Sequence, residues 1–182
     1  MLQGEITGLR AMEKEDLILL RDWRNNPDYR KNFREHKELN LLNQENWFNR
    51  TYGNPNDFMF VIVDLENNEP IGACGLLYTN WINRSTDFSF YIGRDQLYID
   101  EKYAYDAAKT LIKYGFEDLN LNKIWMELYE YDYKKLNFFR EKFNFQVDGK
   151  LRQNAFSEGK YWDSYIISIL KSDFFLDSRG EF

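Results

Sequence analysis

The first chemistry that the sequence suggests is phosphate binding, at the start of a helix near the middle of the chain. Residues 84–92 alternate between apolar and polar side chains, as a strand does. From Tyr103 to Leu119 the apolar residues recur at helical spacing, and Asp100 is placed to cap this helix. A helix N-terminus presents free backbone N–H groups and the positive end of a dipole. The start of this helix is therefore a natural place for a phosphate group.

Cysteine and histidine offer little chemistry of their own. Cys74 lies in an apolar run, 71–77, where a buried strand thiol is expected rather than a nucleophile. His36 is the single histidine and lies in a charged stretch, 34–38, where we expect a solvated side chain. Without a second histidine or cysteine nearby, the sequence supports neither a zinc site nor a Ser/His/Asp triad. We expect no metal.

Composition indicates one soluble domain spanning residues 1–182. Hydrophobic residues make up 43 % and charged residues 30 % of the chain, as in ordinary globular proteins. The net charge of −6 argues against nucleic acid as the main partner. The N-terminus has no basic segment followed by an apolar run, and no later stretch is long enough to span a bilayer. We therefore expect a cytoplasmic protein without a membrane partner.

The elements that position these residues follow from periodicity and turn signals. Strands are predicted at residues 5–12, 58–63, 70–78, 84–92, 123–129, 145–156 and 160–170. Helices are predicted from Glu13 past Trp23, from a cap at Asn43, over 103–119, and from a cap at Asp132 through Lys142; residues 171–182 form a tail. This order predicts an α/β (α+β) fold, with a mixed, mostly antiparallel sheet of about seven strands flanked by about four helices.

Four stretches, taken in order, resemble one family. They are Trp23-Arg-Asn-Asn-Pro27, Ile71-Gly-Ala-Cys-Gly75, Asn83-Arg-Ser-Thr-Asp-Phe88 running on to Tyr91-Ile-Gly93, and Gly149-Lys-Leu-Arg152 with Gly159-Lys-Tyr161. Together with the element order, they make the chain resemble the GNAT superfamily of acyl-CoA N-acyltransferases from about Leu9 to Leu170. The resemblance is closest to the branch of ribosomal-protein N-terminal, spermidine and amino-sugar (pseudaminic acid pathway) acetyltransferases.

The resemblance implies acetyl transfer from acetyl-CoA to a primary amine, and it places the cofactor. The free backbone groups of Phe90, Tyr91 and Ile92 would hold the pantetheine arm where the central strand and the next one diverge. The phosphates of acetyl-CoA would be held by the first residues of the helix, Lys102, Tyr103, Ala104 and Tyr105. Asp132 stands near the position of an Asn that the family carries before its shorter helix.

The resemblance also supplies a base and an acceptor site. Asp87 matches a family Glu and shares a strand face with Ser89 and Tyr91, so it is the first candidate to take the amine proton, directly or through a water. An ion pair with Arg84 or another nearby cation is an equally open role for Asp87. Glu127 on the neighbouring strand is the second candidate. The acceptor site would be walled by residues of the Trp-Arg-Asn stretch and one later tryptophan: Trp23, Arg24, Asn25 and Trp81.

The chain departs from the family in its acetyl-CoA loop and in its general acid. In the family pattern Gln/Arg-x-x-Gly-x-Gly/Ala, Ile99 stands at the Gln/Arg position, Lys102 at the first glycine and Ala104 at the last place, and a side chain at the glycine position obstructs close approach of a pyrophosphate. Asp100 and Glu101 add negative charge where the phosphates belong. The position of the family Tyr that protonates the CoA thiolate falls at Phe139 or Arg140, and neither carries a phenol.

These residues lead to one reading and two alternatives. The first is an N-acetyltransferase that uses acetyl-CoA without a metal, acting on a nucleotide-linked amino sugar first, on a protein N-terminus next and on a polyamine third. One alternative is a catalytically silent GNAT domain that binds or regulates a partner and has lost its acetyl-CoA loop; the other keeps the enzyme and changes the donor, because an altered phosphate loop would suit another acyl-CoA. Amides of residues 101–105 pointing into an open groove would favour the enzyme, and an Asp100 carboxylate bonded to those amides would favour the silent module. Dimers are common in this branch, so a homodimer is expected as well.

Overall fold

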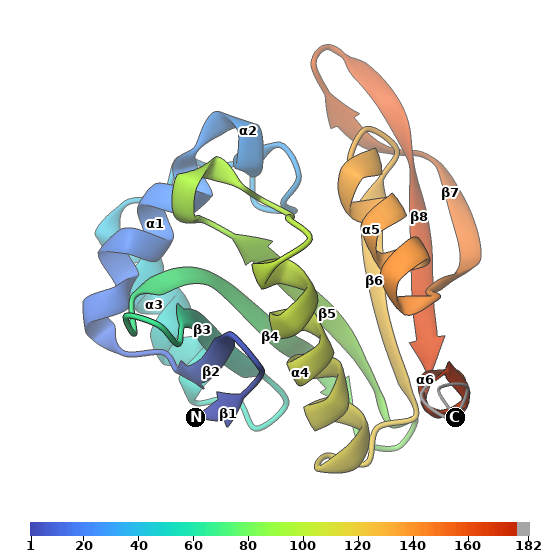
Figure 1. Ribbon diagram of the computed structural model, residues 1–182. Coiled ribbons are helices and arrows are strands. Elements are labelled where there is room, and N and C mark those ends of the chain that lie inside the picture. Colours follow the sequence, from blue (N-terminus) through green and yellow to red (C-terminus); the bar gives the residue numbers. More distant parts are fainter. Residues whose placement is uncertain (178–182) are drawn as a thin grey trace.

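The protein is built on one mixed sheet that splits in two after its central strand (Figure 1). The computed structural model describes residues 1–177. The 8-stranded sheet has the order β1-β2-β3-β4-β5-β6-β8-β7, and every neighbouring pair is antiparallel except β5 and β6. The strands are β1 (Leu2–Gln3), β2 (Thr7–Ala11), β3 (Phe58–Asp64), β4 (Pro70–Asn80), β5 (Ser85–Ile92), β6 (Lys123–Tyr129), β7 (Gln146–Ser157) and β8 (Lys160–Leu170). The predicted fold class is confirmed.

Helices cover both faces of the sheet. They are α1 (Leu17–Asn25), α2 (Pro27–Arg30), α3 (Leu41–Tyr52), α4 (Tyr103–Glu117), α5 (Tyr133–Phe143) and α6 (Lys171–Asp177), with 3₁₀ turns η1 (Lys14–Asp16) and η2 (Arg94–Gln96). In Figure 1, α4 and α5 lie on the near face of the sheet and α3 lies behind it. No described helix is long and apolar enough to cross a membrane.

The alternation predicted for the central strand is confirmed in β5. Phe88 and Phe90 pack their rings against Phe139 of α5, at centroid distances of 5.4 and 6.1 Å. Tyr91 points the other way, where its ring meets Trp23 of α1 and Phe33. The apolar face of β5 therefore joins the core, and the polar face is left for chemistry.

β5 and β6 part after a short parallel ladder. Ser85, Thr86 and Asp87 pair with Lys123, Ile124 and Trp125, and no further β5–β6 pair forms among the described residues. Beyond this point the two strands diverge (Figure 1). The second half of β5 therefore has backbone groups that no neighbouring strand on that side uses.

Several boundaries differ from the sequence prediction for local reasons. Asn43 is not the N-cap of α3: Asn40 caps the helix, and the side-chain oxygen of Asn43 accepts a hydrogen bond from the backbone N–H of Asn40. Asp132 precedes α5 but makes no side-chain cap. The first residues of the predicted tail form α6, and residues 178–182 of that tail lie outside the described part of the chain.

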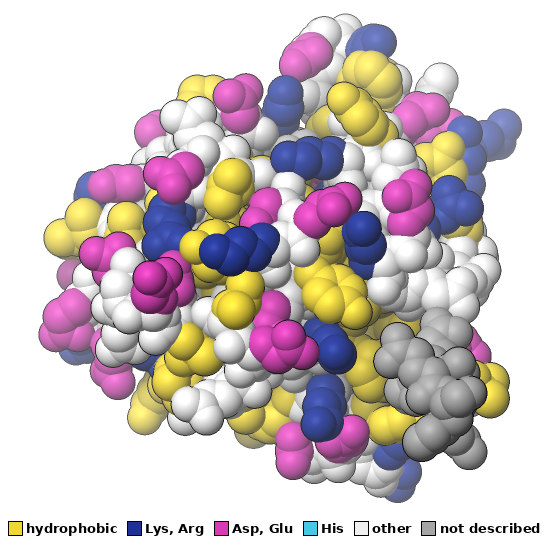
Figure 2. Space-filling view, viewed as in Figure 1, with side chains coloured by type: hydrophobic (Ala, Val, Ile, Leu, Met, Phe, Trp, Pro, Cys, Tyr) yellow, Lys and Arg dark blue, Asp and Glu magenta, His cyan; other side chains and the backbone are white. Residues whose placement is uncertain are grey.

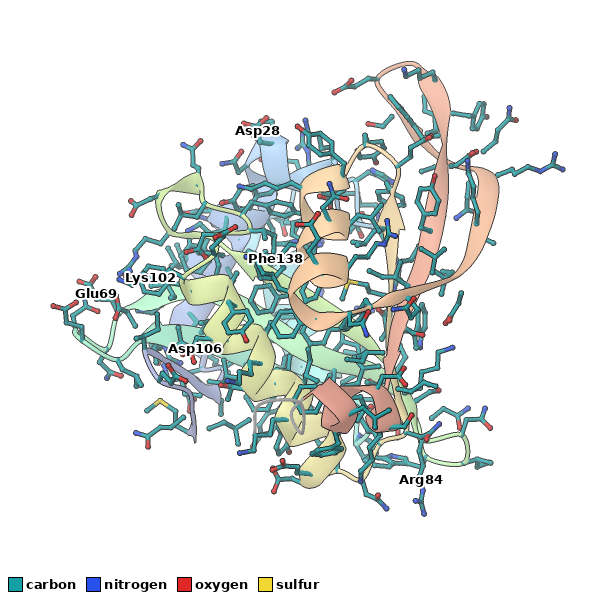
Figure 3. All side chains as sticks on the ribbon, turned by 45° about the vertical axis from the view of Figure 1, so that its right-hand side comes forward. Asp28, Glu69, Arg84, Lys102, Asp106 and Phe138 are labelled. Carbon is teal, nitrogen blue, oxygen red and sulfur yellow. The ribbon has the colours of Figure 1, made fainter. Side chains whose placement is uncertain are left out.

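One buried carboxylate ties the N-terminal strands to α4. Asp106 accepts bonds from the backbone N–H groups of Glu5, Ile6 and Thr7 at 2.8–3.0 Å, and from the Thr7 hydroxyl at 2.7 Å. Figure 3 shows Asp106 on α4 beside these strands, one turn after Lys102. Burial opposes the charge of Asp106, but the donated hydrogen bonds prevail and lower its pKa.

We expect Asp106→Ala to lower the free energy of unfolding by about 3 kcal/mol, because it leaves buried N–H groups without an acceptor. Since the folded pKa of Asp106 lies below its usual 3.8, its stabilisation is present above that pH and is lost as pH falls through the folded value. The variant should therefore lose less stability than the wild type below about pH 4. Urea unfolding from neutral pH to pH 2 measures both effects, with the exposed Asp118→Ala as control; a variant as stable as the wild type would contradict the role.

Candidate active site

A cavity of about 530 Å³ opens on the polar face of β5. Its walls come from α1, the segment between α2 and α3, α3 itself, strands β3, β4, β5 and β6, and the first turn of α5. Asp87, Ser89 and Tyr91 of β5 line it, and it extends to Leu128 and Tyr129 at the parting of β5 and β6. The cavity thus runs from the surface to the point where β5 and β6 diverge.

Asp87 lies buried in this cavity and is paired with an arginine. The side chain of Arg34 donates to the Asp87 carboxylate at 2.5 Å, and its Nε lies 3.7 Å from Glu127. The ion pair considered from the sequence exists, but its cation is Arg34 rather than Arg84, which Figure 3 shows at the lower end of the molecule. Burial raises the pKa of Asp87, and the opposing effect of Arg34 is smaller. A buried carboxylate with a raised pKa is a stronger base than an exposed one.

Glu127 is held by its neighbours in the sheet. Its carboxylate accepts from the Asn154 amide at 2.6 Å and from the Ser164 hydroxyl at 2.7 Å. With Arg34, it lines the cavity close to Asp87. The two predicted candidates for the base are therefore brought together, bridged by an arginine that the sequence reasoning did not single out.

The side chain of Lys135 lies where β5 and β6 diverge. This lysine lies in the first turn of α5, is buried, and donates from Nζ to the backbone carbonyl of Phe90 at 2.6 Å. Within the described chain it has no carboxylate at ion-pair distance. Burial lowers its pKa, against the smaller effects of Asp132 and Asp87, which raise it. A Phe90 backbone group predicted to hold pantetheine is thus occupied by the protein's own ammonium.

The Gly93–Asp100 loop occupies the end of the same strand. Ile92 and Tyr98 exchange both backbone hydrogen bonds, at 2.8 and 2.9 Å. The Tyr98 hydroxyl then donates to Asp132 at 2.6 Å, which explains why that carboxylate does not cap α5. Tyr91 pairs with Ala73 of β4 and turns its side chain to the cavity.

Asp100 occupies the start of α4. Its carboxylate accepts from the backbone N–H groups of Lys102, Tyr103 and Ala104 at 3.2, 3.0 and 2.8 Å. The predicted cap therefore exists, and it is the arrangement that favours the silent module. Tyr105 turns outward and stacks on Phe143 at a centroid distance of 5.2 Å.

Of the four residues expected to wall the acceptor site, Arg24 is the one that the described structure places in the cavity lining. Trp23 packs on the backbone of Gly93, where a Cβ would lie 2.0 Å from the indole. Asn25 bonds through its side chain to both backbone groups of Leu39 at 2.8 Å. Trp81 lies after β4, 44 % exposed, and donates to Asn56 at 2.9 Å.

Arg34 and Lys135 are the residues that sequence reasoning missed. Lys135 had a signal, since it shares the buried face of α5 with Phe138, Phe139 and Phe143 at helical spacing. A lysine in an apolar stripe is a polar group in need of a partner. Arg34 had no such signal, because it stands in a polar, aperiodic segment 53 residues from Asp87.

Comparison with known proteins identifies the family of the chain. The family model described as an acetyltransferase (GNAT) domain matches residues 7–136. The uncharacterized N-acetyltransferase p20 of Bacillus licheniformis is 30 % identical over 115 residues, which is 63 % of this chain and 63 % of that protein. The spermidine N(1)-acetyltransferase of Escherichia coli (strain K12) is 24 % identical over 171 residues, covering 94 % of this chain and 89 % of that one.

Among solved structures, spermidine N-acetyltransferase from Vibrio cholerae in complex with CoA and spermine is similar over almost the whole fold. The TM-score is 0.84 at 26 % identity, covering 93 % of this chain and 98 % of that one. A further structure of the Vibrio cholerae enzyme is described as dodecameric.

The buried Lys135 predicts a pH dependence of stability. Because its folded pKa lies below the usual 10.5, the folded state releases this proton first, and stability rises with pH between the folded value and about 10.5. In Lys135→Met this rise should vanish, whereas the exposed neighbour Lys134→Met should keep it. Urea unfolding from pH 7 upward gives the difference between variant and wild type; parallel curves for all three proteins would show that Lys135 does not titrate in this way.

Proposed function

The chain belongs to the GNAT acetyltransferase family, and from that membership we propose that it transfers an acetyl group from acetyl-CoA to a primary amine of a small molecule. The observation that carries the proposal is the buried carboxylate of Asp87, in a cavity that runs from the surface to the parting of β5 and β6. An amine in this cavity lies beside a base of raised pKa on β5, the strand that would also present the thioester.

The chemistry needs one base, one oxyanion donor and one acid. The amine nitrogen attacks the thioester carbonyl, and Asp87 takes the amine proton, directly or through a water. A backbone N–H of β5 stabilises the oxyanion. When the C–S bond breaks, its electron pair stays on sulfur, and the thiolate needs a proton. Lys135 is suited to give it, because its ammonium lies at the parting and burial lowers its pKa.

The structure fits a CoA phosphate only if Asp100 moves. The amides of Lys102, Tyr103 and Ala104 are already an anion site, since they hold a carboxylate. A phosphate at the same amides would displace that carboxylate, and pantetheine at β5 would displace Lys135 from Phe90. The proposal therefore includes a resting state in which the protein's own side chains fill the cofactor groove.

These contacts also favour a second candidate function. If the Asp100, Lys135 and Tyr98 contacts are permanent, the domain is a silent module that binds a partner through the GNAT fold. The two candidates make opposite predictions for acetyl-CoA binding. Thermal unfolding of the wild type and Asp100→Ala with acetyl-CoA separates them.

The acceptor is the finer part of the proposal. The spermidine N-acetyltransferases named above act on spermidine, which supports a polyamine by comparison, whereas the charges of the cavity favour a different amine. The comparisons give no support to the amino-sugar acceptor expected first. The small-molecule acceptor, the absence of a metal and the homodimer remain predictions; sizing of the purified protein tests the last.

Replacing the base should stop catalysis without closing the site. We expect Asp87→Asn to lower kcat/KM by roughly 10²- to 10⁴-fold, because the variant keeps the shape of the carboxylate and loses the proton acceptor. The thermal shift with acetyl-CoA should be unchanged. Glu127→Gln is the comparison: if it costs more activity than Asp87→Asn, the assignment of the base is reversed.

Replacing Asp100 should lower the stability of the protein and raise its affinity for acetyl-CoA. We expect Asp100→Ala to lose about 1 kcal/mol of unfolding free energy with its cap, and to bind acetyl-CoA roughly fivefold more tightly, since binding no longer breaks that cap. The control is Glu101→Gln, which removes a neighbouring charge and keeps the cap. Thermal unfolding is followed with acetyl-CoA, free CoA and ATP.

The outcomes of this experiment are distinct. Stabilisation of the wild type by acetyl-CoA and CoA but not ATP, increased in Asp100→Ala, supports the enzyme. Stabilisation of neither protein by acetyl-CoA supports the silent module and rejects the acetyltransferase.

A further inference from the structure

The cavity carries more positive than negative charge, unlike the chain as a whole. Its lining includes five cationic side chains, Arg24, Arg34, Lys37, Arg50 and Lys135, and three carboxylates, Glu35, Asp87 and Glu127. The whole chain has a net charge of −6. Acidic and basic side chains are interspersed over the face seen in Figure 2. The positive charge of the cavity lining is therefore not part of a generally basic surface on that face.

The charges are not spread evenly along the cavity. Near Asp87, Arg34 is paired with Asp87 and lies close to Glu127, and Lys135 also acts on the Asp87 carboxylate, so two cations match the two carboxylates here. Arg24 lies beside Phe33 and Tyr91, and Glu35 is the carboxylate that acts on it. The surroundings of Asp87 are thus close to neutral, and the excess of positive charge belongs to the rest of the lining, where Arg24 is suited to bind an anion.

Arg24 is a partly buried guanidinium with no carboxylate bonded to it in the described chain, although Glu35 lies near enough to favour its charge. Its central carbon lies 3.9 Å above the centre of the Phe33 ring. Among residues 1–177 it has no hydrogen-bond acceptor and no carboxylate at ion-pair distance, whereas Arg10, Arg34 and Arg94 are each paired with an aspartate. Burying an unpaired charge is costly. The stacking fixes the plane of the guanidinium while its N–H groups remain free to bind an anion.

Tyr91 offers a second free donor beside Arg24. Its ring meets the Phe33 ring edge-on at 5.4 Å, and the hydroxyl has no hydrogen-bond partner in the described part of the chain. Tyr91 and Asp87 are on the same face of β5, four residues apart, which is roughly 13 Å along a strand. The free donors and the base thus lie on one wall of the cavity at a defined separation.

We propose that Arg24 and Tyr91 form an anion subsite, and that the acceptor is a primary amine that also carries a carboxylate or a phosphate. This inference rests on the proposed acetyltransferase function and specifies its substrate class. The amine end lies at Asp87, and the anionic end binds the guanidinium and the phenol. A polyamine would instead place a second ammonium against Arg24, where like charges repel.

The test compares acceptors that differ only at the far end. Acetyl-CoA consumption is measured with an ω-amino carboxylate, an ω-amino alkyl phosphate and the α,ω-diamine of the same chain length, and with spermidine. We expect the anionic amines to have the higher kcat/KM. Arg24→Met should raise their KM roughly tenfold or more and leave kcat nearly unchanged, since it removes a charged hydrogen bond used for binding. Arg24→Lys should restore part of the loss.

Arg21→Met is the matched control, because Arg21 lies on the same helix, is paired with Asp22 and is not part of the cavity lining. A second readout needs no activity: orthophosphate is titrated into the wild type, Arg24→Met and Arg21→Met, and thermal unfolding is followed. We expect stabilisation of the wild type and Arg21→Met, and its loss in Arg24→Met.

The possible results separate this inference from the proposed function. Equal or better use of the diamine by the wild type overturns the anion subsite while the acetyltransferase stands. If no amine is acetylated, the proposed function fails, and the phosphate titration alone decides: stabilisation that depends on Arg24 supports the subsite, and its absence overturns it.

Discussion

The parting of β5 and β6 is the constraint on which the rest of the structure depends. Once the parallel ladder stops after three residue pairs, the second half of β5 has backbone groups that the sheet no longer satisfies. Buried backbone groups need partners. The chain provides them from three places: Lys135 for the carbonyl of Phe90, Tyr98 for both backbone groups of Ile92, and the Tyr29 hydroxyl, which also donates to the carbonyl of Ile92. A cofactor that uses this strand must replace those partners one for one.

The same parting brings buried charge into the middle of the protein. Asp87, Asp132 and Lys135 are all buried around it, and each is satisfied by a different group: Arg34, Tyr98 and a backbone carbonyl. Burial raises the pKa of both aspartates and lowers that of the lysine, so the site holds charged groups that are poised to change protonation. These are the conditions that proton transfer between an amine and a thiolate requires.

The sequence predicted the elements better than it predicted the site. Periodicity placed β6 at its observed bounds and put Asp87 and Tyr91 on one face of β5, because alternation and helical spacing are local properties. The cap of α4 by Asp100 was also local and was found. The pairing of Asp87 with Arg34 was not, because the two residues are far apart in the chain and either acidic candidate could have taken any of several cations. The cap of α3 was predicted at Asn43, but Asn40 is the N-cap and Asn43 is its partner at the third helical position; because both residues are asparagine, residue type alone did not distinguish the two roles.

The central claim is that acetyl-CoA opens a groove which the chain itself keeps filled. Two-dimensional NMR of the backbone amides during a titration with acetyl-CoA tests it most directly, because the amides of Lys102, Tyr103 and Ala104 report their hydrogen-bond partner. The account predicts saturable shifts of these amides, together with those of Ile92 and Tyr98. Saturable binding that leaves all five amides unchanged, or no binding at all, would contradict it.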